Sequence, residues 1–130
     1  METPLIQPID PATLPASTDN YTHGTLVADI RRTVFVSGQV PWASQGEIPE
    51  DFDSQCRLTW RNVLAVLAEA DMGVRNLAKV TTYLSDRVYR EANSRIRQEI
   101  LGDHCPALTI IITDIYAEKW LLEIEAIAVE

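Results

Sequence analysis

Two glutamates near the C-terminus, Glu123 and Glu125, are the residues whose type and spacing best suit chemistry. Carboxylates serve as general acids and bases and can orient an attacking water. The glutamates alternate with Ile124 and Ala126, and this period of two predicts a strand with both carboxylates on one face. Ile127 continues that face, which is too apolar for plain solvent exposure and too charged for a closed core.

The mixed face of this predicted strand has two interpretations. Self-association across it would cover the apolar side chains and place the carboxylates near subunit boundaries, where a cleft could form. Alternatively, both glutamates simply face water at the edge of a sheet. The pattern leaves both interpretations open, so a site at a subunit boundary is a hypothesis.

Two cysteines and two histidines could also carry chemistry. Cys56 and Cys105 are far apart and form no CxxC or Cys/His ligand spacing, so neither a disulfide framework nor a metal site is expected. Two thiols in a small chain fit a reducing compartment, and we expect the cytoplasm. His23 and His104 are also far apart, so a nuclease-like histidine pair would need a coincidence in space. We expect Cys105 to be a packed cysteine, with a reactive thiol as the alternative.

The charge balance argues against nucleic acid as a partner. Lys and Arg total 11 against 19 Asp and Glu, a net charge of −8, so phosphate backbones are repelled at long range. Three tryptophans could form a stacking platform, but such sites also need a basic groove, so packing roles are expected. No apolar run approaches the roughly 18 residues that span a bilayer, and no secretory leader is recognisable at the N-terminus. We therefore expect neither nucleic acid nor a membrane as a partner.

The chain length of 130 residues suffices for one domain with its own core. Residues 1–20 contain four prolines and are expected to form an extended Pro-rich arm. Residues 21–130 are expected to form a single domain.

Strands and helices are predicted in the order ββαβαββ. The two helices carry apolar stripes at three- and four-residue steps, and each is preceded by an Asp that suits an N-cap. Such a mixture predicts an α+β fold with both helices on one face of a mixed sheet. The predicted strands are 26–28 and 33–36, joined as a hairpin, then 76–84, 108–113 and 120–129; the predicted helices are 52–72, capped by Asp51 or Asp53 and ended by Gly73, and 87–101, capped by Ser85-Asp86 and ended by Gly102.

Seven short motifs, each weak alone, occur in an order and spacing that resemble the RidA/YjgF family of small trimeric proteins. The resemblance covers about residues 21–130 and implies a chorismate-mutase-like fold. It also implies a homotrimer with a barrel-like centre and clefts between neighbouring subunits. The motifs are Tyr21-Thr22-His23-Gly24, Val36-Ser37-Gly38-Gln39-Val40-Pro41, Gln55 with Asn62, Val80-Thr81-Thr82-Tyr83-Leu84, Asn93, Cys105-Pro106-Ala107 and Leu122-Glu123-Ile124-Glu125-Ala126-Ile127-Ala128.

The resemblance implies an activity and a set of cleft residues. Fully active members hydrolyse enamines and imines such as 2-aminoacrylate to ketoacids and ammonia, with no metal or organic cofactor. Some relatives have instead been labelled endoribonucleases or translation initiation inhibitors. The matching positions are Tyr21, Ser37, Gly38, Asn93 and Glu123. Glu123 would activate water, Ser37 and Gly38 would contact substrate, and Tyr21 would form a pocket wall.

Leu108 departs from the family pattern. Deaminating members carry an arginine there, and its forked guanidinium holds the substrate carboxylate. Leucine offers neither donor nor charge, a loss of about 2 to 5 kcal/mol in recognition of an anionic substrate. We expect Leu108 to line a more apolar substrate-binding pocket that does not hold 2-aminoacrylate in the usual pose. Arg31 or Arg32, near the tip of the predicted hairpin, is a candidate replacement for the missing cation.

Three functions from different classes stay open at this point. The first is hydrolysis of an enamine or imine other than 2-aminoacrylate in clefts between subunits. The second is a non-catalytic trimer that binds a small metabolite in the same clefts. The third is a ribonuclease or translation inhibitor, against which the charge balance argues.

Overall fold

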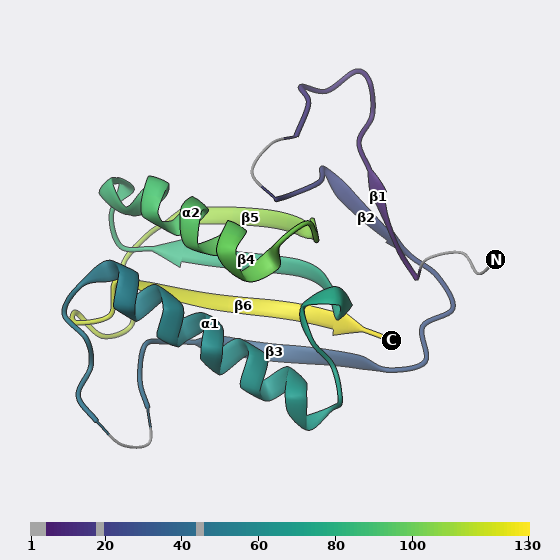
Figure 1. The fold of residues 1–130 in the computed structure, drawn as a ribbon. Helices are drawn as coiled ribbons and strands as arrows, with labels where there is room; N and C mark the ends of the chain where they lie inside the picture. The colour runs from purple at the N-terminus through teal and green to yellow at the C-terminus, as the bar shows by residue number, and fades with distance from the viewer. Residues whose placement is uncertain (1–4, 18–19, 44–45) are drawn as a thin grey trace.

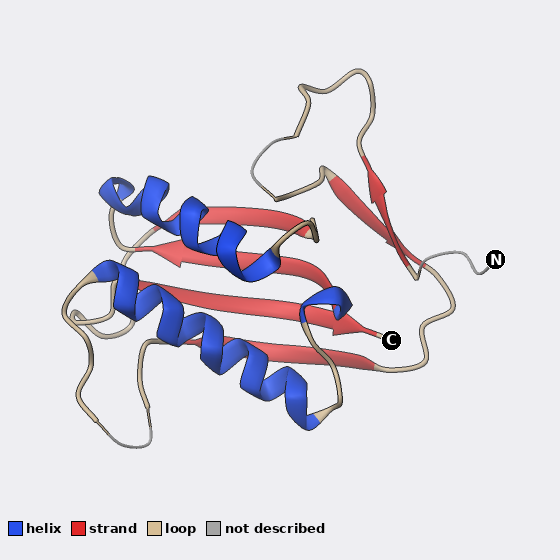
Figure 2. Ribbon diagram, in the orientation of Figure 1, coloured by secondary structure: helices blue, strands red, loops and turns tan. Residues whose placement is uncertain are grey.

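The computed structural model describes residues 5–17, 20–43 and 46–130. Its main layer is a four-stranded sheet in the order β3-β6-β4-β5, with both helices on one face (Figure 1, Figure 2). Strands β4 and β5 are parallel, and the other neighbours are antiparallel. The predicted α+β fold with two helices on one face of a mixed sheet is therefore confirmed. The elements are β3 (Thr33–Gln39), α1 (Phe52–Glu69), β4 (Leu77–Leu84), α2 (Arg90–Leu101), β5 (Ala107–Ile112) and β6 (Leu122–Val129), with short 3-10 turns at Val74–Asn76 and Arg87–Tyr89.

Helix α1 begins at a predicted cap and ends earlier than predicted. The Asp51 carboxylate accepts a hydrogen bond of 2.9 Å from the backbone N–H of Ser54. The helix stops at Glu69, not near residue 72. Asp71 has a φ of 58°, a left-handed conformation that Asp tolerates better than most residues. The chain thus leaves the helix at Asp71, before it reaches Gly73.

Helix α2 lies in the crossover between the parallel strands β4 and β5 (Figure 1). The Asp86 carboxylate accepts a hydrogen bond of 2.9 Å from the N–H of Val88, as expected for a cap. Gly102 ends the helix with a φ of 62°, which is also as predicted.

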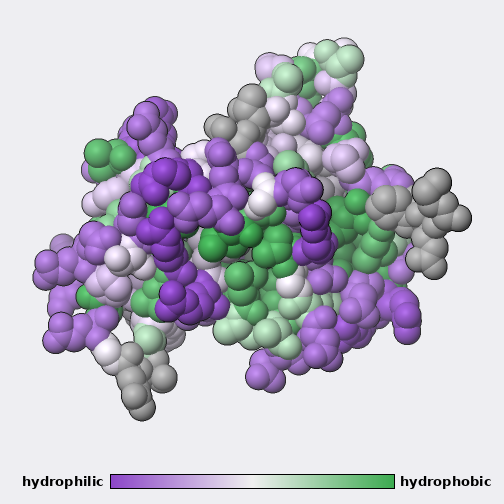
Figure 3. Space-filling model, viewed as in Figure 1, coloured by the Kyte–Doolittle hydropathy of each residue, from purple (hydrophilic) through white to green (hydrophobic). Residues whose placement is uncertain are grey.

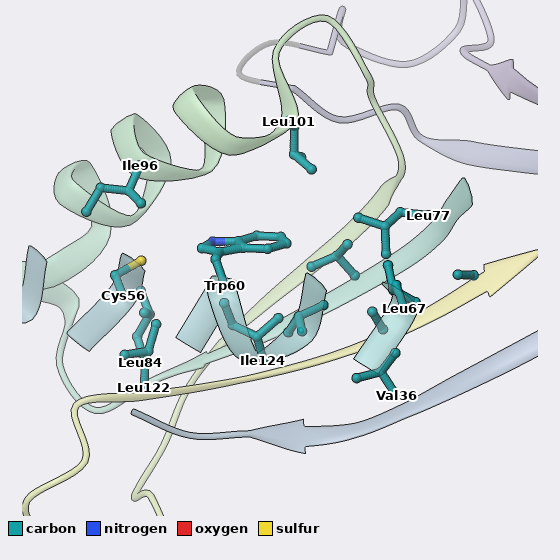
Figure 4. Close-up of a cluster of buried hydrophobic side chains, with 14 of the residues drawn as sticks. Val36, Cys56, Trp60, Leu67, Leu77, Leu84, Ile96, Leu101, Leu122 and Ile124 are labelled. Carbon is teal, nitrogen blue, oxygen red and sulfur yellow. The ribbon is translucent and has the colours of Figure 1, made fainter. Parts of the chain in front are cut away.

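The hydrophobic core lies between the helices and the sheet (Figure 4). This core includes three fully buried helix residues: Trp60 and Leu67 of α1 and Ile96 of α2. The helix side seen in Figure 3 is hydrophilic around a central hydrophobic area. Strand β6 shows the predicted alternation, because every second residue faces the helices and is buried: Leu122, Ile124, Ala126 and Ala128.

The predicted hairpin between residues 26–28 and 33–36 is wrong. Strand β2 (Gly24–Val27) pairs with β1 (Ile6–Ile9) in a separate two-stranded sheet, and β3 pairs with β6. Asp29, at a φ of 56°, turns the chain between the two sheets. Pro8 lies in β1 and lowers the strand propensity of that segment, but a two-stranded sheet has only edge strands, which tolerate proline. The segment predicted as an arm therefore contributes a strand, and the order becomes βββαβαββ.

The two-stranded sheet packs beside the end of the main sheet. The Thr25 hydroxyl donates a hydrogen bond of 3.0 Å to the carbonyl of Ala78, and the backbone N–H of Thr22 donates a hydrogen bond of 3.2 Å to the carbonyl of Pro106. In the part of the chain that the structure describes, no helix has the length and apolar character needed to cross a membrane.

Candidate functional site

The face of the main sheet that the helices leave uncovered carries both glutamates, and we call it the open face. Glu123 and Glu125 alternate with the buried residues of β6 and are both half-buried. Strand pairing places Tyr83 of β4 opposite Glu123 and Thr81 opposite Glu125. The predicted shared face of the two carboxylates is therefore present.

A β-bulge in β3 brings Ser37 and Gly38 beside these carboxylates. Val36 pairs with Ala126 and Gln39 pairs with Ile124, so two residues of β3 stand opposite Glu125 alone. Ser37 is exposed and Gly38 half-buried at this bulge. Two of the predicted substrate contacts thus lie in the strand next to Glu123.

The Glu123 carboxylate lies directly over Gly38. A Cβ built on Gly38 would be 2.7 Å from the carboxyl carbon Cδ of Glu123, closer than real Cβ contacts occur. The glycine therefore leaves the space that the Glu123 side chain occupies. Side-chain Glu123 and backbone Gly38 together form the floor of the candidate site.

Glu125 is held by Tyr83 on the other side of β6. The Tyr83 hydroxyl donates a hydrogen bond of 2.5 Å to Glu125 Oε1. This hydrogen bond raises the pKa of Tyr83, because ionisation would place two anions side by side. Sequence reasoning missed Tyr83, since the contact depends on the register between β4 and β6.

The two carboxylates therefore have different environments. Glu125 is bound to a phenol, whereas Glu123 makes no hydrogen bond or ion pair with the residues that the structure describes. A carboxylate without protein partners can accept a hydrogen bond from water or a ligand. Of the two, Glu123 is the one available for chemistry.

Tyr21 lies far from Glu123 in the same chain. The adjacent residue Thr22 bridges to Ala107 at the start of β5, whereas Glu123 stands in the row of Tyr83 and Ile111. Thr22 and Glu123 are separated by three strand spacings of about 4.8 Å across the sheet and by four residues of about 3.3 Å along the strands. The two perpendicular separations combine to roughly 20 Å. One chain does not bring the predicted Tyr21 wall to Glu123.

A cavity of about 380 Å³ lies next to Tyr21, between the N-terminal strands and the loop before β5. His104 and Cys105 line it, and an ion pair of 2.6 Å between Arg75 and Asp103 lies at its side. The Tyr21 ring meets the His23 ring edge-on, with centroids 5.9 Å apart.

Leu108 and Asn93 lie on the helix side of the sheet. Leu108 pairs with the core residue Val80 and is half-buried against the core. Asn93 lies on the buried face of α2 and is 1% exposed, with its Oδ1 4.0 Å from the sulfur of Cys56 in α1. The single chain therefore separates both residues from Glu123, which lies on the opposite face.

Neither candidate replacement for the missing arginine lies near Glu123. Arg32 pairs with the Glu130 carboxylate at 2.7 Å, and the N–H groups of Arg31 and Arg32 both donate to the Glu130 carbonyl. Glu130 follows the end of β6, while Glu123 stands near its start, about 20 Å away along the strand. Within one chain, neither arginine can therefore contact a substrate bound at Glu123.

Lys79 is the only cation in the four strands of the main sheet, all of whose residues are described. It lies on the open face, and its ammonium donates a hydrogen bond of 2.6 Å to the hydroxyl of Thr109. Sequence reasoning did not single it out, although its place two residues before Thr81 in the predicted strand was a usable signal.

Cys56 is not placed for nucleophilic chemistry, and neither thiol lies on the open face. Cys56 is fully buried, and burial raises its pKa to about 12. Cys105 is half-buried, with its sulfur 3.7 Å from the carbonyl of Asp103. Among the residues described, no group of three or more Asp, Glu, His and Cys side chains is arranged for a metal ion.

Known proteins match this chain over most of its length. The model of the family described as Endoribonuclease L-PSP matches residues 12–130. The putative reactive intermediate deaminase TdcF of Escherichia coli K12 is 31% identical over 119 residues, 88% of this chain and 90% of the relative. The 2-iminobutanoate/2-iminopropanoate deaminase of the same organism is 28% identical over 119 residues, 88% of this chain and 91% of the relative.

Solved structures of related proteins have the same fold as this chain. The crystal structure of E. coli TdcF with bound serine has a TM-score of 0.71 at 28% identity, covering 95% of this chain and 98% of that one. The Rid-family protein YyfB of Yersinia pestis has a TM-score of 0.86, covering 97% and 99%, and at 23% identity supports the fold alone. The chain therefore belongs to the Endoribonuclease L-PSP family, the RidA/YjgF family that its sequence motifs resemble.

Proposed function

We propose that this protein hydrolyses a small imine or enamine to a carbonyl compound and ammonia, in clefts between the subunits of a homotrimer. The observation that carries the proposal is the Glu123 carboxylate over Gly38, free of protein partners among the described residues while Glu125 is occupied. The names of two relatives, a reactive intermediate deaminase and an iminobutanoate deaminase, support the reaction class.

In the proposed reaction, Glu123 orients a water and takes one of its protons as the oxygen attacks the imine carbon. The π electrons of the C=N bond move to nitrogen, which takes that proton from Glu123, and a neutral carbinolamine forms. Glu123 then takes the proton of the carbinolamine hydroxyl and delivers it to the nitrogen, so that the C–N bond breaks and ammonia leaves as the carbonyl forms. An enamine enters the same path once a proton has moved from its nitrogen to its carbon. No metal or organic cofactor is required.

A second copy of the chain is proposed because one chain supplies only part of the cleft. Tyr21 lies roughly 20 Å from Glu123 within one chain, whereas a neighbour could bring its own Tyr21 edge to the open face. The open face also exposes apolar side chains that association would cover: Phe35, 75% exposed, pairs with Ile127, and Ile111 is 39% exposed. The homotrimer that the family resemblance implies would meet both needs.

Leu108 follows Ala107, to which Thr22 bridges, so the same edge of the neighbouring subunit would bring residue 108 to the proposed cleft. A leucine there argues for a substrate other than 2-aminoacrylate. An apolar side chain at this position cannot make the paired hydrogen bonds with which an arginine holds a carboxylate. We propose an imine whose recognition does not depend on a carboxylate clamp at residue 108. The free thiols Cys56 and Cys105 are compatible with the reducing cytoplasm as the place of action.

A non-catalytic metabolite-binding trimer is the second candidate. The relative TdcF is known with serine bound, so a protein of this fold can hold a small polar molecule. A ribonuclease is disfavoured, because the net charge is −8 and both histidines lie outside the open face, His23 just before β2 and His104 just before β5. Neither histidine is near Glu123 within one chain.

The experiment that tests the proposal is an imine-hydrolysis assay. An amino-acid oxidase generates 2-iminobutyrate, semicarbazide traps the remaining imine, and neutral ketimines are followed in parallel by ammonia release. We expect the wild type to act on neutral imines better than on 2-iminobutyrate, and Leu108→Arg to gain at least about tenfold on 2-iminobutyrate. Leu108→Met is the matched control and should gain nothing. Trimers in gel filtration that turn over no imine would overturn the proposal in favour of ligand binding.

A further inference from the structure

Tyr83 and Glu125 form a contact that belongs to none of the predicted cleft residues. The phenol hydroxyl and Glu125 Oε1 are 2.5 Å apart, and both side chains are half-buried on the open face. Strand pairing places Tyr83 of β4 opposite Glu123 of β6, so the Tyr83 side chain reaches diagonally from β4 to Glu125. Tyr83 thus touches the carboxylate two residues away from its own pairing partner.

The two glutamates lean in opposite directions across β6. Glu123 lies over Gly38 of β3, on one side of the strand. Glu125 is bonded to Tyr83 of β4, on the other side. Their Cα atoms are about 7 Å apart, a spacing at which two flexible carboxylates on one face can meet. Like charges so close disfavour each other, and two carboxylates that meet share a proton instead of acting separately.

We propose that Tyr83 is a positioning residue: its hydroxyl holds Glu125 toward β4 and so leaves Glu123 as the single carboxylate that faces the substrate. This inference rests on the proposed function. Without the hydroxyl, Glu125 loses its donor and is free to turn toward Glu123. A proton or water shared between the two carboxylates then reduces the ability of Glu123 to activate the attacking water.

The test is the hydrolysis of one active imine by four proteins: wild type, Tyr83→Phe, Glu125→Gln and the double variant. Phenylalanine keeps the ring and removes only the hydroxyl. We expect Tyr83→Phe to lower kcat about tenfold with KM unchanged within about twofold. Glu125→Gln should stay within about twofold of the wild type, because an amide cannot compete as a base. The double variant should return to the kcat of Glu125→Gln.

This rescue separates positioning from a general structural role. A loss of packing or of assembly caused by Tyr83→Phe would persist in the double variant. The matched control is Tyr89→Phe, which removes a hydroxyl from a ring that stacks on Phe52 at 4.6 Å on the helix side; it should not change kcat. An unchanged kcat in Tyr83→Phe, or a double variant as slow as Tyr83→Phe, would overturn the inference while the proposed function stands. A wild type inactive on every imine would overturn both.

Discussion

The Glu123 carboxylate occupies the space over Gly38 that a side chain at residue 38 would need. The bulge at Ser37 and Gly38 sets this relationship, because it turns two residues of β3 toward one position of β6. A glycine in a strand interior weakens the strand and often marks a bulge or a close approach, and Gly38 lies at both. The position of the proposed catalytic carboxylate thus depends on a backbone feature of the neighbouring strand.

Gly38→Ala should displace Glu123 and lower kcat for imine hydrolysis by about 100-fold or more. The new methyl group meets the far end of a flexible glutamate, so the side chain can move and the fold should survive. Thermal unfolding should therefore change little. Gly24→Ala is the control, because its Cβ would lie 3.7 Å from Ile9 Cβ, an ordinary contact. Equal kcat in the two variants would contradict the account of Gly38.

Tyr83 should ionise above the usual value near 10, since its hydrogen bond to Glu125 raises the pKa of the phenol. Ultraviolet absorbance of the phenolate, recorded for the wild type and Tyr83→Phe during a pH titration, isolates this tyrosine from the other three. Glu125→Gln should lower the ionisation midpoint, because the neighbouring negative charge is gone. An unchanged midpoint would mean that the contact does not exist in solution.

Gln55→Leu should destabilise the protein by about 3 kcal/mol. The buried Gln55 amide donates to the carbonyls of Pro49 and Lys119, at 2.8 and 2.9 Å, and accepts from the N–H of Leu121 at 2.8 Å. Leucine leaves these backbone groups without partners. Urea unfolding measures the loss, and Gln98→Leu on the exposed side of α2 should stay within about 0.5 kcal/mol of the wild type.

Stability should fall in acid partly through Glu130. The hydrogen bond from Arg32 lowers the pKa of Glu130 below its unfolded value of 4.5. The ion pair therefore stabilises the fold at pH values above about 4.5 and loses this effect as the pH falls through the lower folded pKa. Arg32→Ala should show a smaller fall in melting temperature between pH 6 and pH 3 than the wild type, whereas the exposed control Arg61→Ala should match the wild type.

The sequence predicted the elements whose signals are local. The Asp51 cap, the exit at Gly102 and the alternation of β6 all depend on residues close together in the chain, and all are present. The pairing of β2 with β1 depends on a segment that contains Pro8 and has little strand propensity, so the hairpin with β3 was the wrong expectation.

The candidate site was predictable in part for the same reason. The shared face of Glu123 and Glu125 follows from the alternation of one strand, whereas the choice of Glu123, Ser37 and Gly38 follows from the family motifs. The contacts of Tyr83 and Lys79 depend on the register of β4 with its neighbours, which no local pattern specifies. Asn93 fits the family motif, but its side chain lies under α2 because the helix packs that face onto the core.

The central claim is that Glu123 activates water for imine hydrolysis, and the most direct test is kcat of Glu123→Gln on an imine that the wild type turns over. Glutamine keeps the size of the side chain and its place over Gly38 but cannot take a proton. The account predicts a fall in kcat of about 10² to 10⁴, with KM nearly unchanged and the oligomer intact. Wild-type kcat in Glu123→Gln would contradict it.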